Sequence, residues 1–188
     1  MKKKFGIVAA LTALVLTLIA GFCAALIACI NLLTAPIITK NNEAKKAKLC
    51  QEVFETYDAS KSTTILEGFS SNSIEEVIVA YDAEGNFLGY IYTVDGSNAY
   101  GEIELLLGIT SDSKLAGVRF ITNGQSFSSE ADKHLNNQYK TDMTESDVDN
   151  LDLTKSDVTA GATYASKLIR SLVKSAFEDA KTRQGGAN

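Results

Sequence analysis

The chain has 188 residues, 45% of them hydrophobic, and a formal net charge of −5. This length suits one domain of ordinary size plus an anchor, and it argues against two large domains. The acidic residues are scattered and the basic residues form no stripe that could follow a phosphate backbone, so nucleic acid is not expected as a partner.

The first predicted element is a membrane-spanning helix. No charged residue occurs from Phe5 to Thr39, and this apolar run exceeds the roughly 20 residues that a helix needs to cross a bilayer. The lysines of MKKK precede the run, so the positive-inside rule places the N-terminus in the cytoplasm and the following domain outside the cell membrane. This charge bias is weakened by four lysines that follow the run, Lys40, Lys45, Lys46 and Lys48.

Two other interpretations of the apolar run compete with a helix that spans the membrane. A cleaved secretory signal has an apolar core of about 7 to 15 residues, much shorter than this one, so simple cleavage is not expected. The sequence LIAC, Leu26 to Cys29, resembles a lipoprotein signal, although the chain continues apolar beyond it. Lipidation of Cys29 stays as an alternative, and either anchor leaves the soluble part outside the membrane.

The cysteines and the single histidine indicate neither a disulfide framework nor a metal centre. Cys23 and Cys29 lie inside the apolar run, too deep to pair with Cys50 in an exterior domain. One histidine, without a Cys-x-x-Cys motif, offers too few ligands for a zinc or iron–sulfur site. We predict that His134 is an ordinary surface residue of a helix.

After the membrane segment we expect a turn or kink at Pro36, and then a helix that leads into the domain. One face of this helix is formed by Ala47, Cys50, Val53, Phe54 and Tyr57. Residues 58–64 are polar and form a predicted linker. We divide the chain into an anchor at 1–39, a connecting helix and linker at 40–63, and a domain at 64–188.

Two β-hairpins are predicted in the centre of the domain. β-Branched and aromatic residues dominate 75–82 and 86–94, which flank the turn AEGN. The same plan recurs in 101–110 and 114–122, around the sequence SDSK. The centre of the domain is therefore predicted to be an antiparallel sheet.

Two helices are predicted after the sheet, with an acidic loop at 141–159 between them. The first begins at Ser128, where Ser128 or Ser129 is expected to cap it. The second has an apolar face made of Leu168, Ile169, Leu172, Val173, Ala176 and Phe177. This order of elements predicts an α+β domain with an antiparallel sheet and helices packed at one side.

A turn of small residues precedes the last helix. Gly161 permits a positive φ or the close approach of a ligand, and Ala160 and Ala162 add little bulk beside it. The first N–H groups of the helix lack internal partners and carry the positive end of its dipole, which favours a phosphate here. In the simpler interpretation, Thr159 or Thr163 only caps the helix.

The sequence DVTAGAT, residues 157–163, resembles the flavinylation signature Asp-x-x-Ser/Thr-Gly-Ala-Thr of the FMN-binding domain family. The matching positions are Asp157, Gly161, Ala162 and Thr163. That family includes the G component of the Rnf ion-translocating electron transport complex and the C component of the sodium-pumping NADH:quinone reductase. The segments at 30–54 and 99–123 are also similar to the Rnf component, so the resemblance spans most of the chain.

The resemblance implies that Thr163 carries FMN through a phosphoester bond made by a separate flavin transferase. Gly161, Ala162 and Tyr164 would then lie beside the cofactor. The flavin ring would store and pass electrons. The side chains that are candidates to stack on this ring are Tyr90, Tyr92, Tyr100 and Phe127.

The chain departs from the family pattern at two places. Ala160 stands where the signature has a serine or threonine, which removes a hydroxyl but keeps the turn small. The stretch NGQSFSSEADK, residues 123–133, stands where the family usually has a Glu-Thr-Pro-Gly-Leu-Gly loop that covers the cofactor. The surroundings of the flavin are therefore expected to differ from those in the family.

The leading hypothesis is a membrane-anchored flavoprotein subunit that relays electrons, together with other membrane subunits, in an Rnf-type oxidoreductase. Alone it would not be catalytic, and ion transport would lie in its partners, because one helix without intramembrane charge offers no ion path. One alternative is an independent extracytoplasmic flavoprotein for electron export. The other is a degenerate domain that has lost the flavin and serves as a structural subunit.

Overall fold

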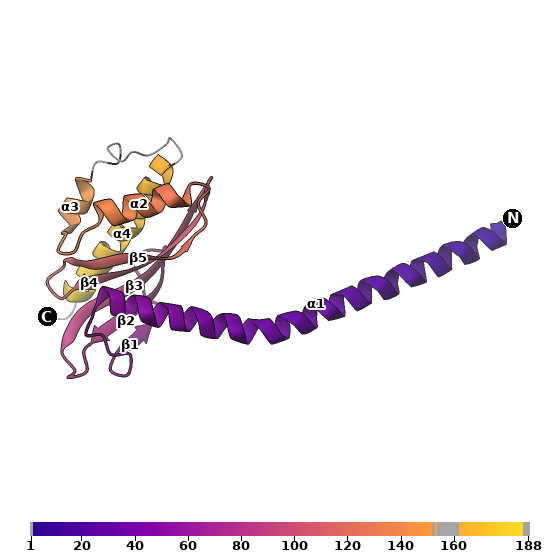
Figure 1. Cartoon of the computed structure of the whole chain (residues 1–188), viewed down its shortest axis with the longest axis horizontal. Coiled ribbons are helices and arrows are strands. Elements are labelled where there is room, and N and C mark those ends of the chain that lie inside the picture. The colour runs from indigo at the N-terminus through magenta and orange to yellow at the C-terminus, as the bar shows by residue number, and fades with distance from the viewer. Residues whose placement is uncertain (1, 152, 154–161, 186–188) are drawn as a thin grey trace. The chain divides into compact units, whose positions relative to one another are not determined.

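The computed structural model describes residues 2–151, 153 and 162–185. It divides into two compact units, Met1–Ala44 and Lys45–Asn188, which we describe separately. Most of helix α1, Lys2–Val53, forms the first unit, and the last turns of this helix, from Lys45, belong to the second unit (Figure 1). α1 continues through Pro36, so of the expected turn or kink at this proline the turn is wrong.

The first unit contains the predicted membrane segment. Within α1, Thr12–Pro36 comprises 25 residues with a mean hydropathy of 2.7. A helix of this length extends about 37 Å, enough to cross the hydrocarbon core of a bilayer. All residues of this segment are exposed, so its apolar surface is suited to lipid and not to water.

An antiparallel sheet forms the centre of the second unit. Its strands lie in chain order, and they are β1 Thr63–Ile65, β2 Ile74–Tyr81, β3 Phe87–Asn98, β4 Gly101–Thr110 and β5 Leu115–Asn123. The two predicted hairpins are confirmed as β2–β3 and β4–β5. β3 also pairs with the whole length of β4, from Gly89 with Thr110 to Asn98 with Gly101. The edge strand β1 lies partly in the segment predicted to be a linker.

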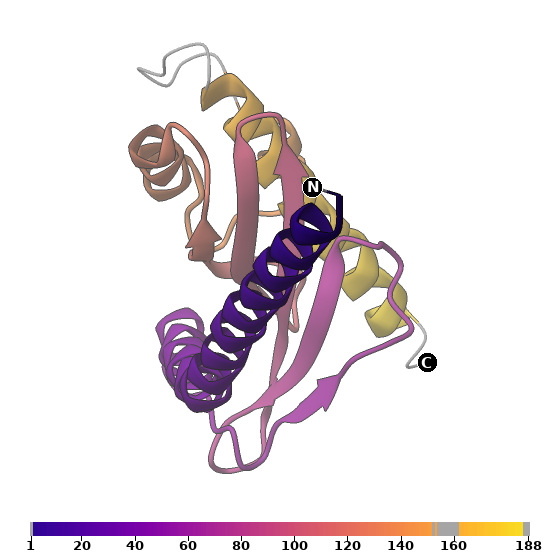
Figure 2. The same cartoon turned by 90° about the vertical axis from the view of Figure 1, so that its right-hand side faces the viewer.

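Among the described residues, three helices follow the sheet and pack on one of its faces. They are α2 Ser128–Gln138, α3 Glu145–Asp149 and α4 Ala162–Gly185. Figure 2 shows α4 running across this face of the sheet. Ile169, Val173 and Phe177 are fully buried against alternate residues of the strands, such as Tyr92 and Leu105. The α+β class and the apolar face of the last helix are thereby confirmed.

The last turns of α1 pack on the opposite face of the sheet. Cys50, Val53 and Phe54 form a second core cluster with residues such as Ile91 and Leu106. The predicted apolar face of this segment is therefore mostly confirmed, and the expected position of all helices at one side holds only for α2, α3 and α4.

Polar contacts hold the same turns of α1 in place. Lys46 forms an ion pair with Glu76 of β2, and the Nε of Arg119 in β5 donates to Oε2 of Glu52 at 3.1 Å. Ala47, which the sequence placed on the buried face, is exposed.

The start of α2 and the presence of α3 both differ from the sequence-based expectation. Phe127 occupies the N-cap position of α2 and no side chain caps this helix, so the expected cap by Ser128 or Ser129 is wrong. α3 lies in the segment predicted as an acidic loop. Thr144 and Asp147 form a reciprocal capping box at its start, which stabilises this short helix.

Candidate functional site

Thr163 lies in the first turn of α4, which begins at Ala162. Backbone N–H groups in the first turn have no partner within the helix, and the side chain of Thr163 is partly exposed. The side chain of Ala162 lies outside the described part of the structure. The same holds for the other residues of the predicted turn, Asp157, Thr159, Ala160 and Gly161.

Three aromatic rings lie together beside this turn of the helix. Tyr164 follows Thr163 and is 54% exposed, and its ring centroid lies 5.4 Å from that of Tyr100. The ring of Phe127, which is 40% exposed, lies 6.4 Å from Tyr100. We call Tyr100, Phe127 and Tyr164 the aromatic group. They come from three separate elements, and together they offer an exposed aromatic surface on which a planar ligand can stack.

Two of the four predicted stacking residues lie elsewhere. Tyr92 is fully buried in the core, and its hydroxyl donates to Oδ2 of Asp179 at 3.2 Å. This burial raises the pKa of Tyr92 far above the usual value. Tyr90 packs between Phe87 and Tyr92, and it pairs with Ile109 towards the end of the hairpin opposite Tyr100. Neither tyrosine belongs to the aromatic group.

The chain between β5 and α2 folds back on the β3–β4 turn. Nε2 of Gln125 donates to the carbonyl of Gly101 at 2.6 Å, and the N–H of Ser126 donates to the carbonyl of Tyr100 at 2.8 Å. Gly101 has φ +138°, and a Cβ there would lie 2.1 Å from the carbonyl oxygen of Gly124. This loop, at which the sequence departs from the family pattern, therefore forms an ordered rim that brings Phe127 next to Tyr100.

Two buried polar atoms beside Tyr100 have no hydrogen-bond partner within the described part of the chain. They are Nδ2 of Asn98 and Oε1 of Gln125. The other end of each amide is occupied, since Oδ1 of Asn98 accepts from the N–H of Tyr100 at 2.8 Å and Nε2 of Gln125 is bound as above. Buried polar groups are nearly always paired, so one donor and one acceptor remain available here.

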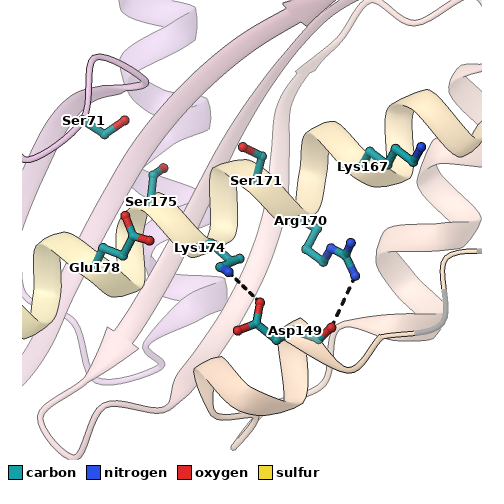
Figure 3. A pocket seen from close by; sticks show the side chains of 8 residues that line it. All are labelled: Ser71, Asp149, Lys167, Arg170, Ser171, Lys174, Ser175 and Glu178. Carbon is teal, nitrogen blue, oxygen red and sulfur yellow. Dashed lines mark hydrogen bonds and ion pairs between the residues drawn. The ribbon is translucent and has the colours of Figure 1, made fainter.

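A polar groove of about 490 Å³ lies along the outer face of α4 (Figure 3). Lys174 and Arg170 point towards the end of α3, where Nζ of Lys174 lies 2.7 Å from Oδ1 of Asp149. Nη1 of Arg170 lies 3.4 Å from the carbonyls of Asp149 and Leu151. These two cations therefore join α4 to α3. Lys167 lies closer to Thr163, one helical turn after it, and its Nζ is 6.0 Å from the centroid of the Tyr164 ring.

His134 is buried, and its prediction as a surface residue is wrong. Its exposed fraction is 0%, and neither ring nitrogen has a hydrogen-bond partner among the residues that the structure describes. Burial lowers the pKa of His134 to about 4, with a smaller effect from the charge of Arg170. The prediction of an exposed His134 failed because α2 packs against both β5 and α4. The helix therefore buries a face that includes His134, Ala131 and Leu135.

Two family models match the chain. The model of the RnfG N-terminal region matches residues 6–53, ending where α1 ends, and the model of the FMN-binding domain matches residues 99–178. Together the two matches are those of an RnfG-like FMN-binding protein. The FMN-binding domain match includes Thr163 and all three residues of the aromatic group. No curated protein matches the chain.

The residues at this site fit FMN. An isoalloxazine ring combines a flat aromatic surface with a polar pyrimidine edge that carries both donors and acceptors. The aromatic group can stack on the flat surface of the ring. The side-chain amides of Asn98 and Gln125, whose Nδ2 and Oε1 have no partner among the described residues, have the hydrogen-bonding chemistry that suits the polar edge. The positive end of the 24-residue helix α4 suits the phosphate, and Lys167 adds a charge nearby.

Proposed function

We propose that this chain is the membrane-anchored flavoprotein subunit of an Rnf-type electron transport complex, with FMN attached to Thr163 through a phosphoester bond. One observation carries the proposal: the hydroxyl-bearing Thr163 is partly exposed at a helix start and adjoins the aromatic group, within the matched FMN-binding domain. Gly161, Ala162 and Tyr164 are the neighbours that we expect to line the attachment point.

Attachment is a phosphoryl transfer in which no atom changes oxidation state. Oγ1 of Thr163 bonds to the phosphorus of an activated FMN ester that a flavin transferase supplies, and the bond from phosphorus to the leaving group of that donor breaks. The hydroxyl proton passes to a base of the transferase. The positive end of the α4 dipole and the charge of Lys167 stabilise the negative phosphodiester.

The residues of the aromatic group hold the cofactor at the surface of the domain. When bound, the flavin accepts electrons from one partner and gives them to another. A ring stacked on Phe127 and Tyr164 keeps an edge accessible to these partners, because both side chains are substantially exposed. Covalent attachment prevents loss of the cofactor outside the cell, so this mode of binding suits an extracytoplasmic domain.

The apolar segment Thr12–Pro36 anchors the domain in the cell membrane as a single span. The lysines before it favour a cytoplasmic N-terminus, with the flavin domain outside. No charged residue lies inside this described segment, so ion transport belongs to other membrane subunits of the complex.

The test is co-expression of the full chain with a flavin transferase, followed by intact-mass measurement and in-gel flavin fluorescence. We expect the wild type to gain the mass of one FMN, and Thr163→Val to lack both the mass and the fluorescence. Thr182→Val, which changes an exposed threonine near the other end of α4, should keep both. Equal flavin content in Thr163→Val, or an unmodified wild type beside an active transferase, would refute the proposal.

A further inference from the structure

Asn98 and Gln125, next to the aromatic group, each hold one buried side-chain atom that has no hydrogen-bond partner among the described residues. We propose that these two amides bind the pyrimidine edge of the flavin ring, Nδ2 of Asn98 donating to a ring acceptor and Oε1 of Gln125 accepting from a ring N–H. They thereby set the orientation in which the ring lies on the aromatic group. This inference rests on the proposed function, because it assumes a flavin at Thr163.

The orientation of Asn98 is fixed by the turn in which it lies. It is the last residue of β3, and its Oδ1 accepts the N–H of Tyr100 at 2.8 Å. That bond requires the oxygen to face the turn, so the amide nitrogen faces away from the Tyr100 backbone and is the unpaired end. A buried N–H without a partner is unfavourable, and a ligand acceptor removes this penalty.

Gln125 presents the opposite chemistry from the rim. The residue is 5% exposed, and its Nε2 is held by the carbonyl of Gly101 at 2.6 Å. Oε1 is therefore the end that has no partner in the described chain. Because Gly101 approaches the backbone at Gly124 too closely for any side chain, the distance between rim and turn is fixed as well.

The two amides flank the backbone of Tyr100, the central residue of the aromatic group. The Tyr100 N–H is bound by Asn98, and its carbonyl is bound by Ser126, the residue after Gln125. An unpaired donor and an unpaired acceptor therefore lie on residues next to the one on which we expect the flavin ring to stack. The pyrimidine edge, where carbonyl oxygens flank an N–H, has the complementary pattern, whereas the dimethylbenzene edge has no polar atom.

Displacement of the Phe127 side chain, with the backbone of the rim kept in place, would give the ring access to the two buried atoms. Phe127 is 40% exposed, and α2 starts behind it without a side-chain cap. Both features leave the side chain of Phe127 weakly restrained, so we expect a flavin to displace it.

The decisive variant is Asn98→Asp in the full, flavinylated chain. The new carboxylate keeps an oxygen for the Tyr100 N–H but replaces the free donor by a negative acceptor. A reduced flavin gains negative charge, so the variant should disfavour reduction by about tenfold, which lowers a one-electron midpoint potential by about 59 mV. Asn136→Asp, at an exposed position of α2, makes the same chemical change away from the amides and should leave the potential unchanged.

A second measurement covers the case in which Asn98→Asp fails to fold. The side-chain amide resonances of Asn98 and Gln125, compared between the flavinylated wild type and the flavin-free Thr163→Val chain, should both shift when the flavin is present. Equal potentials for Asn98→Asp and Asn136→Asp, or unshifted amide resonances, would overturn this inference and leave the proposed function standing. Absence of flavin from the wild type would instead refute the proposed function.

Discussion

The contact between α1 and the sheet depends on the absence of a side chain at Gly108. A Cβ there would lie 2.3 Å from Cγ1 of Val53 and 2.9 Å from Cε2 of Phe54, both closer than carbon atoms can pack. Gly108→Ala therefore forces the end of α1 away from the sheet. Overpacking of this kind costs about 1–3 kcal/mol. At about 2–4 °C per kcal/mol, the midpoint of thermal unfolding of the domain should fall by roughly 2–12 °C, measured by circular dichroism in detergent.

The sheet supplies its own control for this experiment. Gly117 pairs with Gly108 across β4 and β5, and a Cβ at Gly117 would be 3.7 Å from its nearest neighbour, Cγ2 of Val53. Gly117→Ala should leave the unfolding midpoint nearly unchanged. Adding Val53→Ala to Gly108→Ala removes the closest clash and should recover part of the loss. Equal midpoints for the two single alanine variants would show that Val53 and Phe54 do not pack on Gly108.

Two further results are expected. Lys167→Gln should slow flavin transfer to the chain about two- to fivefold in a time course of flavin fluorescence, because a charge near an exposed helix end contributes about 0.3–1 kcal/mol. Lys181→Gln, at the far end of α4, should leave the rate of transfer unchanged. Equal rates for the two variants would count against a role of Lys167 at the phosphate. Folding lowers the pKa of His134 from 6.5 to about 4, so below pH 6.5 the unfolded chain binds a proton that the folded chain does not. The free energy of unfolding should therefore be highest above pH 6.5 and fall by about 3 kcal/mol as the pH drops to 4. Denaturant titration should show a smaller fall for His134→Phe. The same pH dependence in the wild type and in His134→Phe would contradict the burial of this histidine.

The regular elements of the domain could be predicted because their signals are local. The two hairpins show strand-forming residues on both sides of short turns, and α4 shows apolar residues at helical spacing. β1 has three residues and sits at the sheet edge, so its sequence hardly differs from a polar linker. α3 has five residues, and the Thr-x-x-Asp capping box before it was the one signal that could have revealed it.

The candidate site was predictable only in part, because its members meet through tertiary contacts. The sequence pointed to Thr163 by its motif, but it ranked Tyr92 and Tyr100 alike as stacking residues. Only the pairing of strands and helices shows that Tyr92 faces Asp179 in the core whereas Tyr100 faces Tyr164. The roles of Asn98 and Gln125 depend on which end of each amide the backbone occupies, and no sequence pattern reports that.

The position of Tyr164, the residue after Thr163, beside Tyr100 follows from the way α4 packs on β3. Gly96 lies two residues before Asn98, and a Cβ there would be 3.0 Å from Cδ1 of Leu168 and 3.2 Å from Cδ2 of Leu172. The missing side chain lets these leucines approach the strand, which fixes the height of α4 along the sheet. Thr163 lies five residues before Leu168, about 1.4 helical turns, so this contact also brings the start of α4 to the β3–β4 turn. The attachment residue and the aromatic group are therefore positioned by the same core packing that stabilises the domain, and the site does not need a separate scaffold.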